Sequence, residues 1–166
     1  MAGRPAEVQN IPMTLQTEKL GGHMAVAVSG IDLARLDSPD AQTNLRRLLN
    51  DNLVLCVRGQ KLAPPAFRDA MARFGTPMRR LQLAATSECD EVNIISSEDR
   101  DVLGDGKKLV NGASWHTDDS FMRQPCTLTM LYGVTVPSRG GDTQFVNMHN
   151  AYDDLPEEVL QLDFGN

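Results

Sequence analysis

The stretch from Cys126 to Val136 constrains the fold of this chain more than any other. Its residues alternate between two sets over the whole stretch, one of them being Cys126, Leu128, Met130, Tyr132, Val134 and Val136. Because successive side chains of a β-strand point to opposite faces, this period of two predicts a long strand. Proline and paired glycine from Pro137 to Gly141 then favour a turn, and a new strand is expected from Thr143 to Val146.

Shorter apolar runs predict further strands. They are bounded by polar residues or glycine and are rich in β-branched side chains, as half-buried or buried strands are. The runs extend from Met24 to Val28, from Leu53 to Val57 and from Val92 to Ile95. The sequence therefore predicts a β-rich protein.

Proline and capping residues mark the expected helices. Ser38 followed by Pro39 predicts an N-cap with proline in the first turn, and apolar residues recur after it at helical spacing. Pro64 begins a second expected helix, with Gly75 in the C-cap role. A third helix is expected to start at Pro156. Together with the strands, these helices indicate an α+β protein.

A histidine and an aspartate two residues apart, His116 and Asp118, are the candidate metal ligands. On a strand their side chains would project from the same face, where an imidazole nitrogen and a carboxylate oxygen can reach one ion. Two histidines and one carboxylate on a single face, with the remaining positions open, are typical of non-haem Fe(II) oxygenases. The H-x-D pattern supplies two of these three ligands locally.

The residues around this pair resemble a known family. They read W-H-T-D-x-S-F from Trp115, P-S-x-G-G-D-T-x-F from Pro137 and A-Y-D-D-L from Ala151. Upstream, the V-x-G-I-D-L segment from Val28 and the LVLCVRGQ segment from Leu53 continue the match. Together these motifs resemble the taurine dioxygenase (TauD/TfdA-like) family of Fe(II)- and 2-oxoglutarate-dependent dioxygenases, over roughly Leu15 to Leu155.

The resemblance implies a double-stranded β-helix, or jelly-roll, with flanking helices. It also implies hydroxylation of a small organic substrate coupled to decarboxylation of 2-oxoglutarate to succinate, with Fe(II) and O2. His116 and Asp118 would bind the metal, and the Thr143 hydroxyl would bind the 2-oxoglutarate carboxylate. In the family the second histidine ligand and a cosubstrate arginine lie far downstream. The sequence ends at Asn166, so a partial jelly-roll without the C-terminal half of the barrel is expected.

The residues expected to meet the substrate are Arg80, Asn111 and Ser114. In the family, the segment after the second helix carries polar residues that contact the substrate, and this chain has Arg79 and Arg80 there. An arginine suits a carboxylate or sulfonate because its planar guanidinium donates in a fork. A solvated surface pair is the alternative for these two residues.

Three functional hypotheses follow. The first is a dioxygenase whose activity is weak or absent in this chain alone, with His149 as the local alternative for the missing ligand. The second is a non-catalytic β-rich binding or subunit-interaction module, since an open half-barrel exposes strand edges and apolar surface. The third, an unrelated zinc protein, is disfavoured because cysteine and histidine clusters are absent from the sequence.

The composition of the sequence limits the classes of partner that we expect for this chain. A net charge of −6 argues against nucleic acid as a partner, and no apolar stretch is long enough for a membrane span. Three widely spaced cysteines suggest reduced thiols and a cytoplasmic location. Residues 1–13 read as a loose tail before one incomplete dioxygenase domain, 14–166. A small-molecule substrate, and either a homo-oligomer or a complementing C-terminal half, are the expected partners.

Overall fold

The computed structural model describes residues 15–79, 88–96 and 114–161 of the chain. The chain divides into two compact units. Unit 1 comprises Met1–Asp32, Thr43–Gly59 and Arg139–Asn166, and unit 2 comprises Leu33–Gln42 and Gln60–Ser138. The expected tail, residues 1–13, lies outside the described residues.

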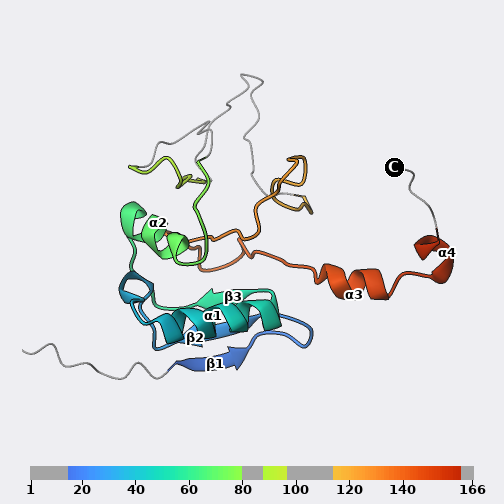
Figure 1. Cartoon of the computed structure of the whole chain (residues 1–166), viewed down its shortest axis with the longest axis horizontal. Coiled ribbons are helices and arrows are strands. Elements are labelled where there is room, and N and C mark those ends of the chain that lie inside the picture. Colours follow the sequence, from blue (N-terminus) through green and yellow to red (C-terminus); the bar gives the residue numbers. More distant parts are fainter. Residues whose placement is uncertain (1–14, 80–87, 97–113, 162–166) are drawn as a thin grey trace, which may run out of the picture. The chain divides into compact units, whose positions relative to one another are not determined.

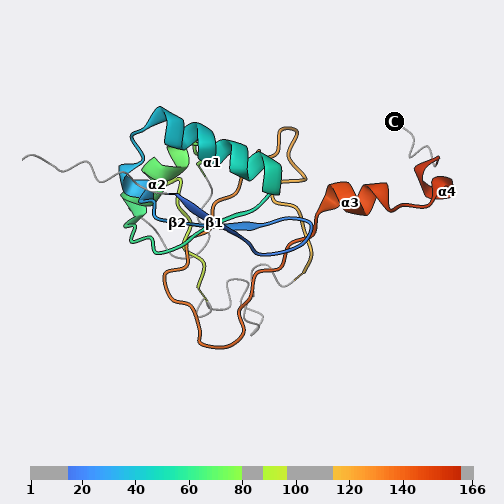
Figure 2. The same ribbon diagram turned by 90° about the horizontal axis from the view of Figure 1, so that it is seen from below.

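Unit 1 is built on a three-stranded mixed sheet with the order β1-β2-β3 (Figure 1). Strand β1 (Gln16–Lys19) pairs antiparallel with β2 (Val26–Ser29), and β2 pairs parallel with β3 (Leu55–Val57). A parallel pair needs a long crossover, which helix α1 (Pro39–Asn52) provides. Figures 1 and 2 show α1 over one face of this sheet. The strands expected near Val28 and Val57 are therefore confirmed.

Helix α1 begins where the proline predicted it. The Ser38 hydroxyl accepts a hydrogen bond from the Ala41 amide at 3.3 Å, which satisfies a free donor of the first turn. In the part of α1 that belongs to unit 1, Leu45 is completely buried. The helix ends at Asn52, and the next residue, Leu53, has a φ of 63°, the left-handed conformation that is common after a helix C-terminus.

Unit 2 has a small apolar core between a 3₁₀ turn, η1 (Leu33–Arg35), and helix α2 (Pro64–Ala72). Its buried side chains include Leu33, Leu36, Leu62, Phe67 and Ala70. The Arg73 guanidinium ties the two elements together by donating to the Leu36 carbonyl oxygen and, at 3.1 Å, to Asp37 Oδ1. The expected C-cap at Gly75 is wrong. Arg73 takes that place in a right-handed conformation because its own amide bonds to the last turn.

Two short helices follow in unit 1, α3 (Met148–Asp153) and α4 (Glu157–Leu160). The Asn147 side chain caps α3 by accepting from the amides of His149 and Asn150 at 3.0 and 3.3 Å. The same side chain donates to the His23 carbonyl oxygen at 3.2 Å. The helix predicted to start at Pro156 is confirmed, with Pro156 as N-cap. Of the helices described here, none has the length and apolarity needed to cross a membrane.

The strands predicted at residues 126–136 and 143–146 are not formed, and residues 92–95 contribute a single bridge residue, Ile94. The period of two reports how side chains alternate, but a strand also needs a neighbour for its backbone hydrogen bonds. Among the described residues no strand pairs with residues 126–136. Leu131, Val134 and Val136 are accordingly 62, 84 and 72% exposed. The described residues thus form a small mixed sheet with helices, which is consistent with part of a β-rich fold.

Candidate metal site

His116 and Asp118 meet in unit 2, with His116 Nε2 lying 3.3 Å from Asp118 Oδ1. The strand expected at this pair is not formed. Asp118 instead opens a turn, which the Met122 amide closes by donating to the Asp119 carbonyl oxygen at 2.9 Å. Asp119 takes a φ of 56°, a left-handed conformation that aspartate tolerates better than most residues. The turn, rather than a strand, therefore brings the two side chains together.

The partner of the other ring nitrogen fixes the tautomer of His116. Nδ1 lies 2.8 Å from the Ser114 carbonyl oxygen. A carbonyl oxygen only accepts, so Nδ1 carries the proton, and Nε2 of the neutral ring presents a lone pair. This is the arrangement that metal-binding histidines commonly show. Ser114, expected to contact substrate, thus uses its backbone to orient His116.

A neutral ring presents the Nε2 lone pair to the Asp118 carboxylate, so that two acceptors face one another, whereas a protonated ring donates from Nε2 to Oδ1. Two acceptors at this distance repel unless a proton or a cation lies between them. With metal–ligand bonds of about 2.1 Å, a spacing of 3.3 Å corresponds to a ligand–metal–ligand angle of about 100°. The donor types and their spacing therefore fit one divalent ion.

Thr129 holds the second oxygen of the carboxylate. Its hydroxyl donates to Asp118 Oδ2 at 2.7 Å and lies 3.5 Å from Cys126 Sγ. Sequence reasoning missed this residue, because the alternation around it gave no sign of which other segment it contacts. Because Oδ2 accepts this hydrogen bond, the other carboxylate oxygen, Oδ1, is the one that faces His116.

Tyr132 anchors the segment that carries Thr129. Its hydroxyl accepts from the Leu62 amide at 3.1 Å and donates to the Gln60 carbonyl oxygen at 3.2 Å. Its ring lies 5.8 Å from the Phe67 ring of α2, tilted by 34°. Residues 126–136 are therefore attached to the α2 core although they do not form a strand.

The pair lies at the surface. The side chains of His116 and Asp118 are 53 and 37% exposed, and Trp115 and Phe121 beside them are 66 and 87% exposed. Within the described parts of the chain, no group of three histidine, cysteine or acidic side chains is placed to hold a metal. Two ligands are thus in place and a third is not supplied by these residues.

The remaining predicted ligands and cosubstrate contacts belong to unit 1. His149 lies on α3, and Thr143 precedes that helix. His23 Nδ1 lies 3.3 Å from the Asn150 side-chain nitrogen, which only donates, so Nδ1 accepts and the neutral ring is protonated at Nε2. The structure therefore groups Ser114, His116 and Asp118. Arg80 and Asn111 lie outside the described residues.

Acidic side chains engage two arginines of unit 2. Arg79 lies 3.3 Å from Asp90 Oδ2 and 3.8 Å from Glu91 Oε1. The Arg79 side chain is 76% exposed and lies at the surface. On α2, the hydrogen bond from Arg68 to Asp69 and the charge of that carboxylate raise the pKa of Arg68, which keeps it cationic.

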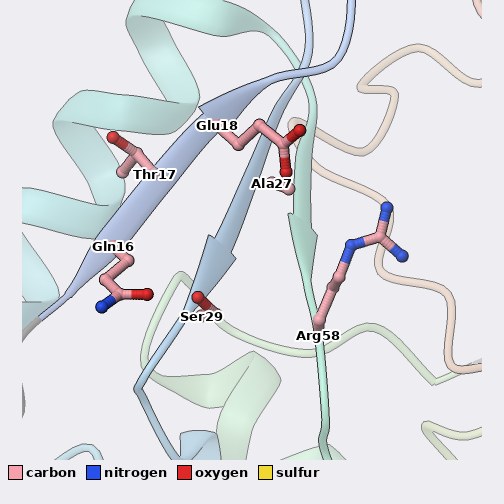
Figure 3. A pocket seen from close by; sticks show the side chains of 6 residues that line it. All are labelled: Gln16, Thr17, Glu18, Ala27, Ser29 and Arg58. Atoms are coloured by element: carbon pink, nitrogen blue, oxygen red, sulfur yellow. The ribbon is translucent and has the colours of Figure 1, made fainter.

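A separate shallow hollow of about 160 Å³ lies on the sheet of unit 1 (Figure 3). Residues of β1 and β2 line it, together with the residue that follows β3; they are Gln16, Thr17, Glu18, Ala27, Ser29 and Arg58. None of the predicted site residues is among them. Glu18 is its one carboxylate, so this hollow lacks the ligand set that the His116 site begins to provide.

The chain is similar in sequence to known proteins over most of its length. It is 32% identical over 157 residues to an alkylsulfatase of Acinetobacter baylyi, covering 93% of this chain and 46% of that protein. It is 28% identical over 158 residues to the alpha-ketoglutarate-dependent 2,4-dichlorophenoxyacetate dioxygenase of Cupriavidus pinatubonensis, covering 89 and 55%. The chain thus spans about half the length of the curated relatives it matches.

A solved structure and a family model extend the comparison. The crystal structure of AAD-2 in complex with Mn(II) and N-oxalylglycine matches with a TM-score of 0.58 and 22% identity, over 89% of this chain and 52% of that one, which shows a shared fold. The model for the "Taurine catabolism dioxygenase TauD, TfdA family" matches residues 16–162. Since that match covers most of the sequence, the chain belongs to the taurine catabolism dioxygenase TauD, TfdA family.

Proposed function

We propose that this chain is part of an Fe(II)- and 2-oxoglutarate-dependent dioxygenase in which His116 and Asp118 bind the metal. The observation that carries the proposal is the 3.3 Å approach of His116 Nε2 and Asp118 Oδ1, with the ring tautomer suited to a metal. Iron with 2-oxoglutarate and O2 supplies the oxidising chemistry when bound. The residues of this chain bind and orient these groups.

The names of the relatives support the cosubstrate and a class of substrate. One relative is named an alpha-ketoglutarate-dependent dioxygenase of 2,4-dichlorophenoxyacetate, a carboxylate, and another an alkylsulfatase. We infer a small anionic organic substrate, hydroxylated while 2-oxoglutarate is decarboxylated to succinate. Thr143 donates its hydroxyl to the 2-oxoglutarate carboxylate. Arg80, Asn111 and Ser114 contact the substrate in this proposal.

The number of metal ligands limits the turnover that we expect from this chain alone. The sequence holds three histidines, and His23 and His149 belong to unit 1, whereas His116 belongs to unit 2. The described residues offer two ligands to the ion. We infer weak turnover or none from the 166-residue chain, with the barrel's remaining ligand and the cosubstrate arginine supplied by further polypeptide. Three free thiols suit the cytoplasmic location proposed with it.

The test is retention of radiolabelled 2-oxoglutarate by the chain in equilibrium dialysis with Mn(II). The wild-type chain is expected to retain it in a Mn(II)-dependent way, and His116→Ala to abolish this retention. His149→Ala, which removes an exposed imidazole from α3, is the matched control and is expected to behave as wild type. Equal retention by His116→Ala and wild type contradicts the proposed site. Substrate-dependent succinate formation by the pure chain contradicts the inference of weak turnover.

The second candidate function is a non-catalytic binding or subunit-interaction module. The exposure of Leu131, Val134 and Val136, whose alternation suits a paired strand, favours it. Light scattering after size-exclusion chromatography tests this candidate. A dimer or larger assembly that dissociates in Val134→Asp supports it, and a monomer at every concentration contradicts it.

A further inference from the structure

The Thr129 hydroxyl reaches the far oxygen of the proposed carboxylate ligand, at 2.7 Å from Asp118 Oδ2. We propose that Thr129 is a positioning residue that holds Asp118 in a single-oxygen binding geometry for the metal. This inference rests on the proposed function, because it assigns a partner to a metal ligand of that site.

The two oxygens of Asp118 have different neighbours. Oδ1 faces His116 Nε2 at 3.3 Å, and Oδ2 accepts from the Thr129 hydroxyl. Rotation of the carboxylate about its last bond is broad and nearly free in solution. The hydrogen bond opposes that rotation and leaves Oδ1 directed at the position shared with His116. Partners of this kind orient a ligand before the metal arrives.

The hydroxyl of Thr129 is itself oriented. An ionised carboxylate only accepts, so the single hydroxyl proton goes to Asp118. The remaining contact, 3.5 Å to Cys126 Sγ, is then a weak hydrogen bond donated by the thiol. Two successive donors in one direction reinforce each other. The thiol therefore favours the rotamer that serves Asp118.

The backbone of Thr129 is held by the Tyr132 anchor three residues later. That hydroxyl bridges the Leu62 amide and the Gln60 carbonyl oxygen just before α2. Thr129 therefore reaches Asp118 from a segment attached to the unit 2 core, rather than from the turn that carries Asp118 itself. An independent attachment of this kind restricts the carboxylate more than a neighbour on the same turn would.

The expected effect is moderate because the contact lies near the surface. Loss of a partner to a metal ligand typically lowers metal affinity by about 10–100-fold. Asp118 is 37% exposed, and water competes for Oδ2, so the lower end of that range applies. Thr129→Val is expected to weaken Mn(II) binding about tenfold.

Mn(II) titration of the full chain, followed by the loss of the free-ion electron paramagnetic resonance signal, tests the inference. Thr129→Val keeps the shape and removes the hydroxyl, whereas Thr129→Ser keeps the hydroxyl and is expected to bind Mn(II) nearly as wild type does. Thr127→Val makes the same chemical change at an exposed threonine two residues earlier and is expected to leave the affinity unchanged. Circular dichroism melting of each variant identifies any that fails to fold.

A double-variant comparison separates positioning from a general structural role. In a chain that already carries Asp118→Ala, adding Thr129→Val is expected to change Mn(II) affinity no further, because the carboxylate it positions is gone. Equal affinity in Thr129→Val and wild type, while His116→Ala abolishes binding, overturns this inference alone. Mn(II) binding that does not depend on His116 overturns the proposed function and this inference with it.

Discussion

Replacing Tyr132 by phenylalanine removes one hydroxyl that serves two backbone groups. The hydroxyl accepts from the Leu62 amide at 3.1 Å and donates to the Gln60 carbonyl oxygen at 3.2 Å, both partly buried. A hydrogen bond of this kind contributes about 0.5–1.5 kcal/mol net. Phenylalanine keeps the ring beside Phe67. The free energy of unfolding is therefore expected to fall by about 1–3 kcal/mol.

Urea unfolding followed by circular dichroism measures this change from the shift in the transition midpoint. Tyr152→Phe is the matched control, because Tyr152 on α3 is 62% exposed and loses a hydroxyl that water already solvates. That variant is expected to stay within about 0.5 kcal/mol of wild type. If Tyr132→Phe is as stable as Tyr152→Phe, the segment of residues 126–136 is not anchored to the α2 core in the way described.

Two further pairs of substitutions test the packing and the backbone. Leu45→Ala, at a position with 0% exposure, is expected to lower the free energy of unfolding by about 2–5 kcal/mol in urea titrations. Leu131 is 62% exposed, so Leu131→Ala should change this free energy by less than about 0.5 kcal/mol. Equal losses in the two variants would refute the assignment of Leu45 to the core. Gly140→Ala places a side chain at a φ of 70° and should cost about 1–2 kcal/mol. Gly75→Ala has open space and no such φ, so a comparable loss there would show that the glycine effect is not conformational.

Elements with local signals were predictable from the sequence. Pro39 and Pro64 begin α1 and α2, as expected, because proline in a first turn costs no hydrogen bond. Apolar runs marked β2 and β3. Strand β1 (Gln16–Lys19) was missed because its four side chains are all exposed and polar. Its pairing with β2, which no local pattern reports, makes it a strand.

The long alternating segment, in contrast, was predicted to be a strand and does not form one. Residues 126–136 have the side-chain pattern of a strand, and the described residues give that segment no strand to pair with. Helix α3 was not predicted, although Asn147 is a good N-cap residue and was the signal available in the sequence. For residues 126–136 the missing information was a hydrogen-bond partner.

Part of the candidate site could also be predicted from the sequence, and part could not. His116 and Asp118 are two residues apart, so their approach is set by a few backbone angles and could be anticipated. Thr129 reaches Asp118 across eleven residues, and Tyr132, three residues after Thr129, packs against Phe67 of α2. Such contacts depend on how segments pack. The role of Thr143, in unit 1, stays a prediction.

The measurement that tests the central claim most directly is electron spin echo spectroscopy of Mn(II) bound to the chain. An imidazole nitrogen bound to Mn(II) modulates the echo, so the signal reports whether a histidine is a ligand. We expect nitrogen modulation in the wild-type chain and in His149→Ala, and its loss in His116→Ala. Modulation that survives in His116→Ala would show that His116 is not the ligand and would contradict the assignment of this site.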